Sequence, residues 1–276
     1  MFDYEFMRNA FIAGTIVAVV AGLVGYFVVL RALAFAGHAL SHVGFAGASG
    51  AVAAGVSPIA GLLLFTMGGG AVMGALGARL RGRDVVIGIV LAFMLGLGVL
   101  FLSLYRGYAT QAYAILFGDI VGISTIDVLV TLAAGVITLA ALAAIYRPLL
   151  FASLDDEVAA ARGVPVRALS VGFMLLLALA VSEAVQVVGV LLVFALLVTP
   201  AAIAERFTVR PPLVMACAAG LGVLFTWLGL TVAYYAPPPV SFFITTIAFT
   251  TYLAVRGVQA LRTRGRRGGA ADLEAA

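Results

Sequence analysis

The chain has two histidines, His38 and His42, and they lie four residues apart in a stretch without charged residues. On an α-helix this spacing places both imidazoles on one face. Such a pair can bind one borderline divalent cation. The rings can instead form hydrogen bonds to nearby backbone or hydroxyl groups, for which Ser41 is close in sequence. The sequence leaves both interpretations open.

A few other polar residues lie within apolar stretches, where an ionisable side chain is costly unless it is paired or wet. Glu183 and Gln186 are three residues apart and predict a second polar face, which either lines a water-filled path or lies near the outer headgroups. Asp119 is either a helix cap or a ligand. Pro200 removes a backbone hydrogen bond, so it predicts either a hinge or a static kink.

The composition indicates what surrounds these residues. Of 276 residues, 64% are hydrophobic and only 10% are charged, which is too little polar surface for a water-soluble globule. The sequence therefore predicts an all-α bundle in a lipid bilayer, formed as a single domain over residues 1–276. The part after residue 262 is short, basic and rich in glycine and alanine, and we expect it to be a disordered tail over 262–276.

The apolar stretches between charged residues predict about nine spans, with eight also possible, because a helix needs roughly 20 apolar residues to cross the hydrocarbon layer. Two long stretches divide at prolines, and a third divides near Gln186 to Gly189. The stretches are 9–30, 32–78 (two spans), 85–105, 128–146, 168–204 (two spans) and 211–255 (two spans).

Arginine placement predicts the orientation, because positively charged connections stay in the cytoplasm. Nine spans with the N-terminus outside and the C-terminus in the cytoplasm place fourteen of the sixteen arginines on the cytoplasmic side. Only Arg8 and Arg106 then lie outside. The chain is thus predicted to be a multi-pass membrane protein, with lipid as the surrounding partner.

The connection over 147–168 predicts a short helix on the cytoplasmic face. Ser153 and Asp156 have the spacing of a capping box, acids fill the first turn, and Gly163 with Pro165 ends the helix. This helix is either a solvated connector or a rigid rod that docks on a cytoplasmic partner, with Val158, Ala159 and Ala161 available for contact.

Enzymatic functions are disfavoured by the sequence. The chain has no lysine, which a nucleotide-binding P-loop requires. Its single cysteine excludes both a disulfide and a cysteine-based zinc site. Because no nucleophile and base are paired in any motif, we expect no catalysis, no permanently bound cofactor and no nucleic-acid partner.

Four blocks resemble the permease subunits of bacterial zinc, manganese and iron ABC importers, in the order of that family. They extend the similarity over most of the chain, and their combination is specific. The blocks are AGHALSHVGFAG (36–47), LFGDIVGIS (116–124), SLDDEVAAARGVPV (153–166) and VVGVLLVFALLVTPAAIA (187–204).

The resemblance implies a homodimer of permeases that imports a divalent metal by alternating access. It also implies two cytoplasmic ATPase subunits that bind the ATP and a solute-binding protein at the outer face. Metal would be held by His38, His42 and Glu183, with Asp119 and Gln186 as further candidates on the path. The ATPase subunits would dock through a segment that includes Ser153, Asp155, Asp156, Glu157, Ala160 and Gly163.

Two departures from the family affect the metal. Many relatives have an aspartate where this chain has His38, so the ligand role transfers more safely to His42, and the softer site favours zinc over manganese. A family aspartate near the last outer loop is also missing from residues 234–245. The alternatives are a permease for an iron chelate, haem or cobalamin, and a channel or secondary carrier that works without a motor.

Overall fold

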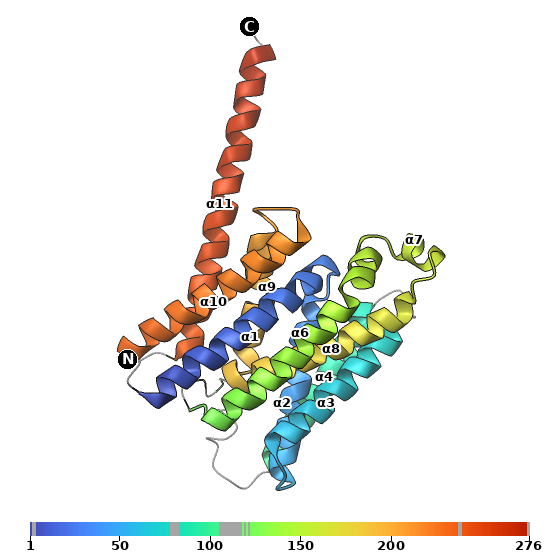
Figure 1. Ribbon diagram of the computed structural model, residues 1–276, viewed down its shortest axis with the longest axis vertical. Coiled ribbons are helices and arrows are strands. Elements are labelled where there is room, and N and C mark those ends of the chain that lie inside the picture. Colours follow the sequence, from blue (N-terminus) through green and yellow to red (C-terminus); the bar gives the residue numbers. More distant parts are fainter. Residues whose placement is uncertain are drawn as a thin grey trace.

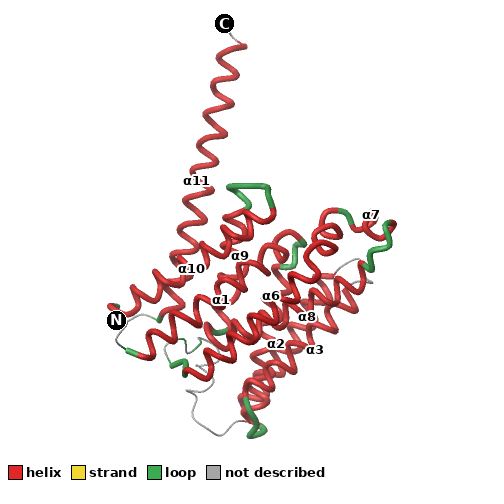
Figure 2. Tube along the Cα trace, in the orientation of Figure 1, coloured by secondary structure: helices red, strands yellow, loops and turns green. Residues whose placement is uncertain are grey.

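The structure is a computed structural model that describes residues 1, 4–77, 83–104, 118, 120, 122–236 and 239–274. Every regular element in these ranges is helical (Figure 2), which confirms the predicted all-α class. The helices are α1 (Glu5–Leu30), α2 (Ala34–Ala53), α3 (Pro58–Gly77), α4 (Arg83–Leu104), α6 (Thr125–Leu154), α7 (Asp156–Ala161), α8 (Val166–Val188), α9 (Val190–Ala204), α10 (Pro211–Tyr235) and α11 (Val240–Glu274).

Each predicted span coincides with one of the long helices in the described residues. Seven of them are long and apolar enough to cross a membrane. Helix α2 falls outside this set, and α9 is shorter, with 15 residues. The chain is therefore a multi-pass helical membrane protein, whereas the exact count of nine crossings stays a prediction.

The helix connections gather at two opposite ends of the bundle (Figure 1). One end, here called the α7 end, carries α7, the α1–α2 turn and the α9–α10 connection. The N-terminus, the α2–α3 turn and the end of α10 lie at the opposite end. The connections 155–165 and 205–210, which contain Arg162, Arg206 and Arg210, thus lie at one end of the bundle, as the predicted topology requires.

Helix α1 lies in the centre of one half of the bundle because two of its glycines admit close neighbours. A Cβ atom on Gly25 would overlap the carbonyl oxygen of Leu197 in α9, and one on Gly22 would lie 2.6 Å from the backbone of Ala219 in α10. In lipid, small residues at such contacts let helices approach and gain van der Waals energy. Gly47 of α2 and Gly61 of α3 approach each other in the same way.

Hydrogen bonds tie α1 to α6 at the end opposite α7. The Asn9 side chain donates to the carbonyl of Ile123 at 3.1 Å and to the hydroxyl of Thr125 at 3.3 Å. Ser124 and Asp127 form a reciprocal capping box at the start of α6. These bonds hold the first turns of α1 and α6 together.

The predicted helix in the 147–168 connection is present as α7, but its cap differs from the prediction. Helix α6 continues through Ser153 to Leu154, and Asp155 caps α7 by accepting a hydrogen bond from the Val158 amide at 2.9 Å. Because Ser153 is still helical, its predicted capping box with Asp156 is wrong. Ala159 was also expected to be available for docking, yet it is fully buried against α6 and α8.

Gly189 alone separates α8 from α9, with φ of +79°, a conformation that is open to glycine and strained for other residues. Gly118 packs directly against this junction, where a Cβ atom would collide with Val188 and Gly189. Further along, Pro200 is buried inside α9, which continues past it to Ala204. The hinge at Pro200 stays a prediction.

Helix α11 extends beyond the bundle toward the C-terminus (Figure 1). Its helical backbone includes residues 262–274, where the sequence predicts disorder. A helix without tertiary contacts is marginal in water. The disordered tail therefore stays a prediction.

The glycine contact between α1 and α9 generates a first prediction. Gly25→Ala should lower the thermal midpoint of the detergent-solubilised protein strongly, because its methyl group must displace the α9 backbone. Gly172→Ala is the matched control, since nothing lies within 4 Å of a Cβ atom at that helical position. The control should be neutral or stabilise by up to about 1 kcal/mol. Equal midpoints for the two variants would contradict the close α1–α9 contact.

Candidate metal site

His38 and His42 lie on one face of α2, as the spacing predicts. Their ring centroids are 4.7 Å apart and the ring planes are nearly perpendicular, at 85°. Zinc binds imidazole nitrogen at about 2.0–2.1 Å, so two rings this close can approach one ion with only small rotations. Both side chains are half-buried, which leaves them accessible to a passing cation.

The competing interpretation, in which Ser41 binds a histidine ring, does not match the geometry. The Ser41 hydroxyl donates to the backbone carbonyl of His38 at 2.7 Å. No side chain or backbone group of the described residues forms a hydrogen bond with either imidazole. The ring nitrogens are therefore free to accept a cation.

Helix α9 covers one side of the pair through Phe194. The Phe194 ring lies 5.5 Å from the His38 ring, edge to face. Phe194 also lines a groove between α9 and α11, together with Thr199, Thr245 and Tyr252. Phe194 thus contacts His38 and also forms part of the wall of a groove that contains hydroxyl oxygens.

Glu183 does not join the histidine pair. Its carboxylate points toward α6 and α1, since a Cβ atom on Gly135 would lie 3.0 Å from Oε1 and equally close to Ile16. Within the described part of the chain, no group of three His, Cys, Asp or Glu side chains could hold an ion. One chain therefore offers two imidazoles, and Glu183 is a separate feature.

The surroundings of Glu183 are unusual for a carboxylate. The residue is only 4% exposed, and neither carboxylate oxygen has a hydrogen-bond partner among the residues that the structure describes. The hydroxyl of Thr131, one turn before Gly135 on α6, is also buried and unpartnered. A buried polar group without a hydrogen bond is costly, so this side chain is a point of weakness in the packing of α8 against α6.

Two further residues, Gln186 and Asp119, were predicted to lie on the path of the metal. Gln186 is half-buried near the end of α8. Asp119 lies outside the described residues, so its role as a cap or a ligand stays open. Phe194 was not predicted from the sequence, because an aromatic residue in an apolar helix gives no sign of its contact with a histidine on another helix.

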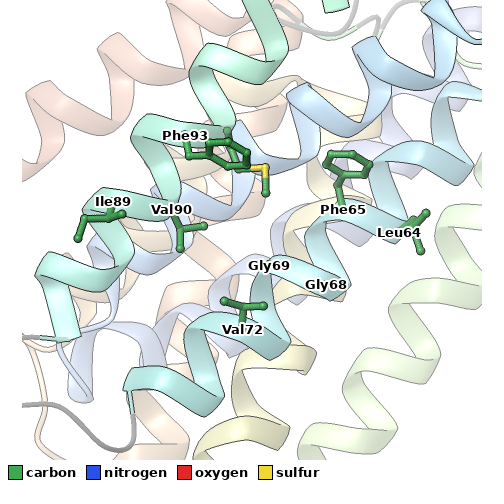
Figure 3. A pocket seen from close by; sticks show the side chains of 9 residues that line it. Leu64, Phe65, Gly68, Gly69, Val72, Ile89, Val90 and Phe93 are labelled. Carbon is green, nitrogen blue, oxygen red and sulfur yellow. The ribbon is translucent and has the colours of Figure 1, made fainter.

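A second groove lies between α3 and α4, and Figure 3 shows the side chains that form it. Its lining is apolar throughout, with glycines on α3 and a single thioether, that of Met94, as the only sulfur. Leu64, Ile89 and Phe93 are largely exposed there, which fits a surface covered by lipid chains. This groove offers no set of ligands for a divalent cation.

The predicted docking residues of the 147–168 connection are mostly accessible. Asp155, Asp156, Glu157, Ala160 and Gly163 are exposed. Gly163 has φ of +83° and ends α7, with the Val164 amide bonded back to the Ala159 carbonyl. Ser153 is half-buried and faces inward, where it accepts a hydrogen bond from Arg31.

Fold and site together define a multi-pass membrane protein with two neighbouring histidines on α2 and an exposed connector helix, α7. Residues 3–259 match the family model of the ABC 3 transport family. The chain belongs to this family and is a metal-transporting ABC permease of the bacterial membrane.

Several relatives are similar over most of their length. A protein named manganese transport system membrane protein MntC, from Halalkalibacterium halodurans, is 33% identical over 83% of this chain and 79% of its own. The manganese import system permease protein ScaB from Streptococcus gordonii is 30% identical over 84% of each chain. A probable metal transport system membrane protein from Treponema pallidum is 32% identical over 95% of this chain and 100% of its own.

Two solved structures share the fold. PsaBC from Streptococcus pneumoniae, in complex with Fab, superposes with a TM-score of 0.81 at 28% identity and covers 91% of both chains. An inward-facing putative metal-chelate type ABC transporter has a TM-score of 0.72 at 19% identity, over 88% of this chain and 84% of that one. The second likeness concerns the fold alone.

The separation of Glu183 from the histidines leads to a second prediction. Glu183→Gln replaces an unpartnered buried carboxyl group with an amide of similar shape, so its thermal midpoint should stay close to that of the unaltered protein. The increase in midpoint on adding zinc or manganese should be retained in Glu183→Gln and lost in His42→Ala. A metal-induced shift that disappears in Glu183→Gln would instead place this carboxylate at the metal site.

Proposed function

We propose that the chain is the membrane-spanning subunit of an ABC importer that moves a divalent transition metal ion into the cytoplasm, with His38 and His42 as its metal contacts. The pair on α2, with ring centroids 4.7 Å apart, carries this proposal. Two ligands per chain hold an ion less firmly than the four of a structural zinc site. Weak retention suits a transporter, which must release what it binds.

The chemistry of the site and the names of the relatives point to different metals. Two imidazoles without a carboxylate suit zinc better than manganese, which prefers oxygen ligands. The relatives with printed substrates are named for manganese. We therefore propose zinc first, on the ligand chemistry, and manganese second, on the similarity to these relatives.

The assembly that we propose has two copies of this chain, two cytoplasmic ATPase subunits and a metal-binding protein at the outer face. The arginine-rich α7 end supports a cytoplasmic position for α7. The exposed side chains of α7 supply a docking surface on a short capped helix. ATP binding would then move α7 and open the bundle alternately to the two sides.

Uptake in cells tests the role of the histidines. His42→Ala should reduce uptake of radioactive zinc at least about tenfold, as expected from the loss of one of two metal contacts. Ser41→Ala is the matched control, because the Ser41 hydroxyl bonds only within its own helix. Membrane abundance is measured alongside. Unchanged uptake by His42→Ala at normal abundance would refute the ligand role.

A pair of glycine variants tests docking at α7. Gly163→Val and Gly55→Val both place a side chain where φ is positive, +83° and +72°, with open space around it. The backbone strain is therefore matched, at roughly 1–2 kcal/mol each. Only Gly163 is next to α7, so only Gly163→Val should lower both ATPase co-purification and uptake. Equal losses in the two variants would indicate a general effect of strain.

Competition during uptake distinguishes the proposed cargo from its alternatives. Unlabelled zinc and manganese should compete with radioactive zinc, whereas chelated iron, haem and cobalamin should not. Competition by a chelate would favour a chelate permease. Metal movement by the purified chain in liposomes without an ATPase would favour a channel or secondary carrier.

A further inference from the structure

Arg31 connects three helices at the α7 end. It directly follows α1, and its guanidinium donates one hydrogen bond to the Ser153 hydroxyl and one to the Ser170 hydroxyl, both at 3.0 Å. Ser153 lies in the last turn of α6 and Ser170 near the start of α8. The flat guanidinium can reach both hydroxyls at once because its donors form a rigid fork.

The two serines lie on either side of α7, and α7 is fixed between them. Ala152, Ala159 and Leu169 form a small buried cluster that joins the end of α6, the middle of α7 and the start of α8. Asp155 follows α6 immediately and caps α7. A displacement of α7 must therefore carry Ser153 and Ser170 with it, and with them the acceptors of Arg31.

On its other side, Arg31 is part of the turn that places α2. The Leu33 amide donates to the Val28 carbonyl at 2.7 Å and the Ala32 amide to the Val29 carbonyl at 3.1 Å, which is a Schellman motif. Ala32 occupies the left-handed position of this motif, at φ of +53°, where glycine is usual. Helix α2 begins directly afterwards, at Ala34.

The histidine pair is close to this turn. His38 is the fifth residue of α2, about 6 Å along the helix from its start. Because the turn between α1 and α2 is only three residues long and internally hydrogen-bonded, a rotation at Arg31 changes the direction of α2. The connection from α7 to His38 is thus a short series of bonded elements.

We propose that Arg31 is a positioning residue that transmits movement of α7 to the histidine pair on α2. This inference rests on the proposed function, in which an ATPase moves α7. Arg31 does not touch the metal. Its loss should leave metal binding and ATP hydrolysis in place but weaken the link between them.

The test uses the permease reconstituted in liposomes with the ATPase subunits that purify with it, and measures zinc transported per ATP hydrolysed. Arg31→Gln removes both hydrogen bonds and should lower this ratio about five- to tenfold. Ser170→Ala removes one of them and should lower the ratio about two- to fivefold. Arg31→Lys should lie between them, because an ammonium group lacks the fork. The midpoint shift on zinc addition should stay unchanged in all three.

Arg206→Gln is the matched control. Arg206 lies in the α9–α10 connection, which is also at the α7 end, and its guanidinium donates a hydrogen bond to Gln259 of α11 at 3.3 Å. Arg206→Gln should transport as much zinc per ATP hydrolysed as the unaltered protein. If Arg31→Gln fails to accumulate, Ser170→Ala and Arg31→Lys decide the result. An unchanged ratio in these variants, with normal hydrolysis, overturns the role of Arg31.

Failure of the proposed function itself gives a different result. In a Cys217→Ala background, Ala160→Cys places one thiol on the exposed face of α7. Cross-linking of this thiol to the ATPase supports docking at α7. If no ATPase partner is found, or if the cross-link does not form, both proposals are overturned. If the cross-link forms but the Arg31 variants transport as much zinc per ATP hydrolysed as the unaltered protein, only the positioning role of Arg31 is overturned.

Discussion

Helices in lipid cannot be held together by the hydrophobic effect, because lipid tails are as apolar as the side chains that pack. This protein depends on close backbone contacts instead. Gly25 lets α1 meet the α9 backbone, and Gly47 and Gly61 do the same for α2 and α3. These contacts fix α2 and α9 relative to the rest of the bundle. The histidine pair and Phe194 can face each other only because both helices are held in this way.

Polar side chains are rare in this setting, and two of them join helices at the ends of the bundle. Asn9 ties α1 to α6 at one end, and Arg31 ties α1 to α6 and α8 at the other. The two histidines differ, since neither ring has a hydrogen-bond partner in the described part of the chain. A polar pair without a structural partner, half-buried on one helix face, is what binding of a mobile cation requires.

The sequence predicted the class, the long helices and α7 well, because these follow from hydropathy, spacing and capping residues. It predicted less well where tertiary contacts decide. The cap of α7 is Asp155 instead of Ser153, because α6 continues for an additional turn. Glu183 was predicted as a further metal contact; its carboxylate lies near Gly135 of α6 and Ile16 of α1, and its role on the path stays a prediction. The bonds of Arg31 span more than 120 residues in sequence, and no local pattern indicates them.

The identity of the atoms that bind the metal shows directly whether His38 and His42 form the metal site. X-ray absorption at the zinc edge, on the purified permease loaded with one equivalent of zinc, reports the identity and distance of the bound atoms. We expect imidazole nitrogens at about 2.0–2.1 Å from the zinc and their loss in His42→Ala. A shell of oxygen atoms alone, or a spectrum that is identical in His42→Ala, would show that the metal binds elsewhere.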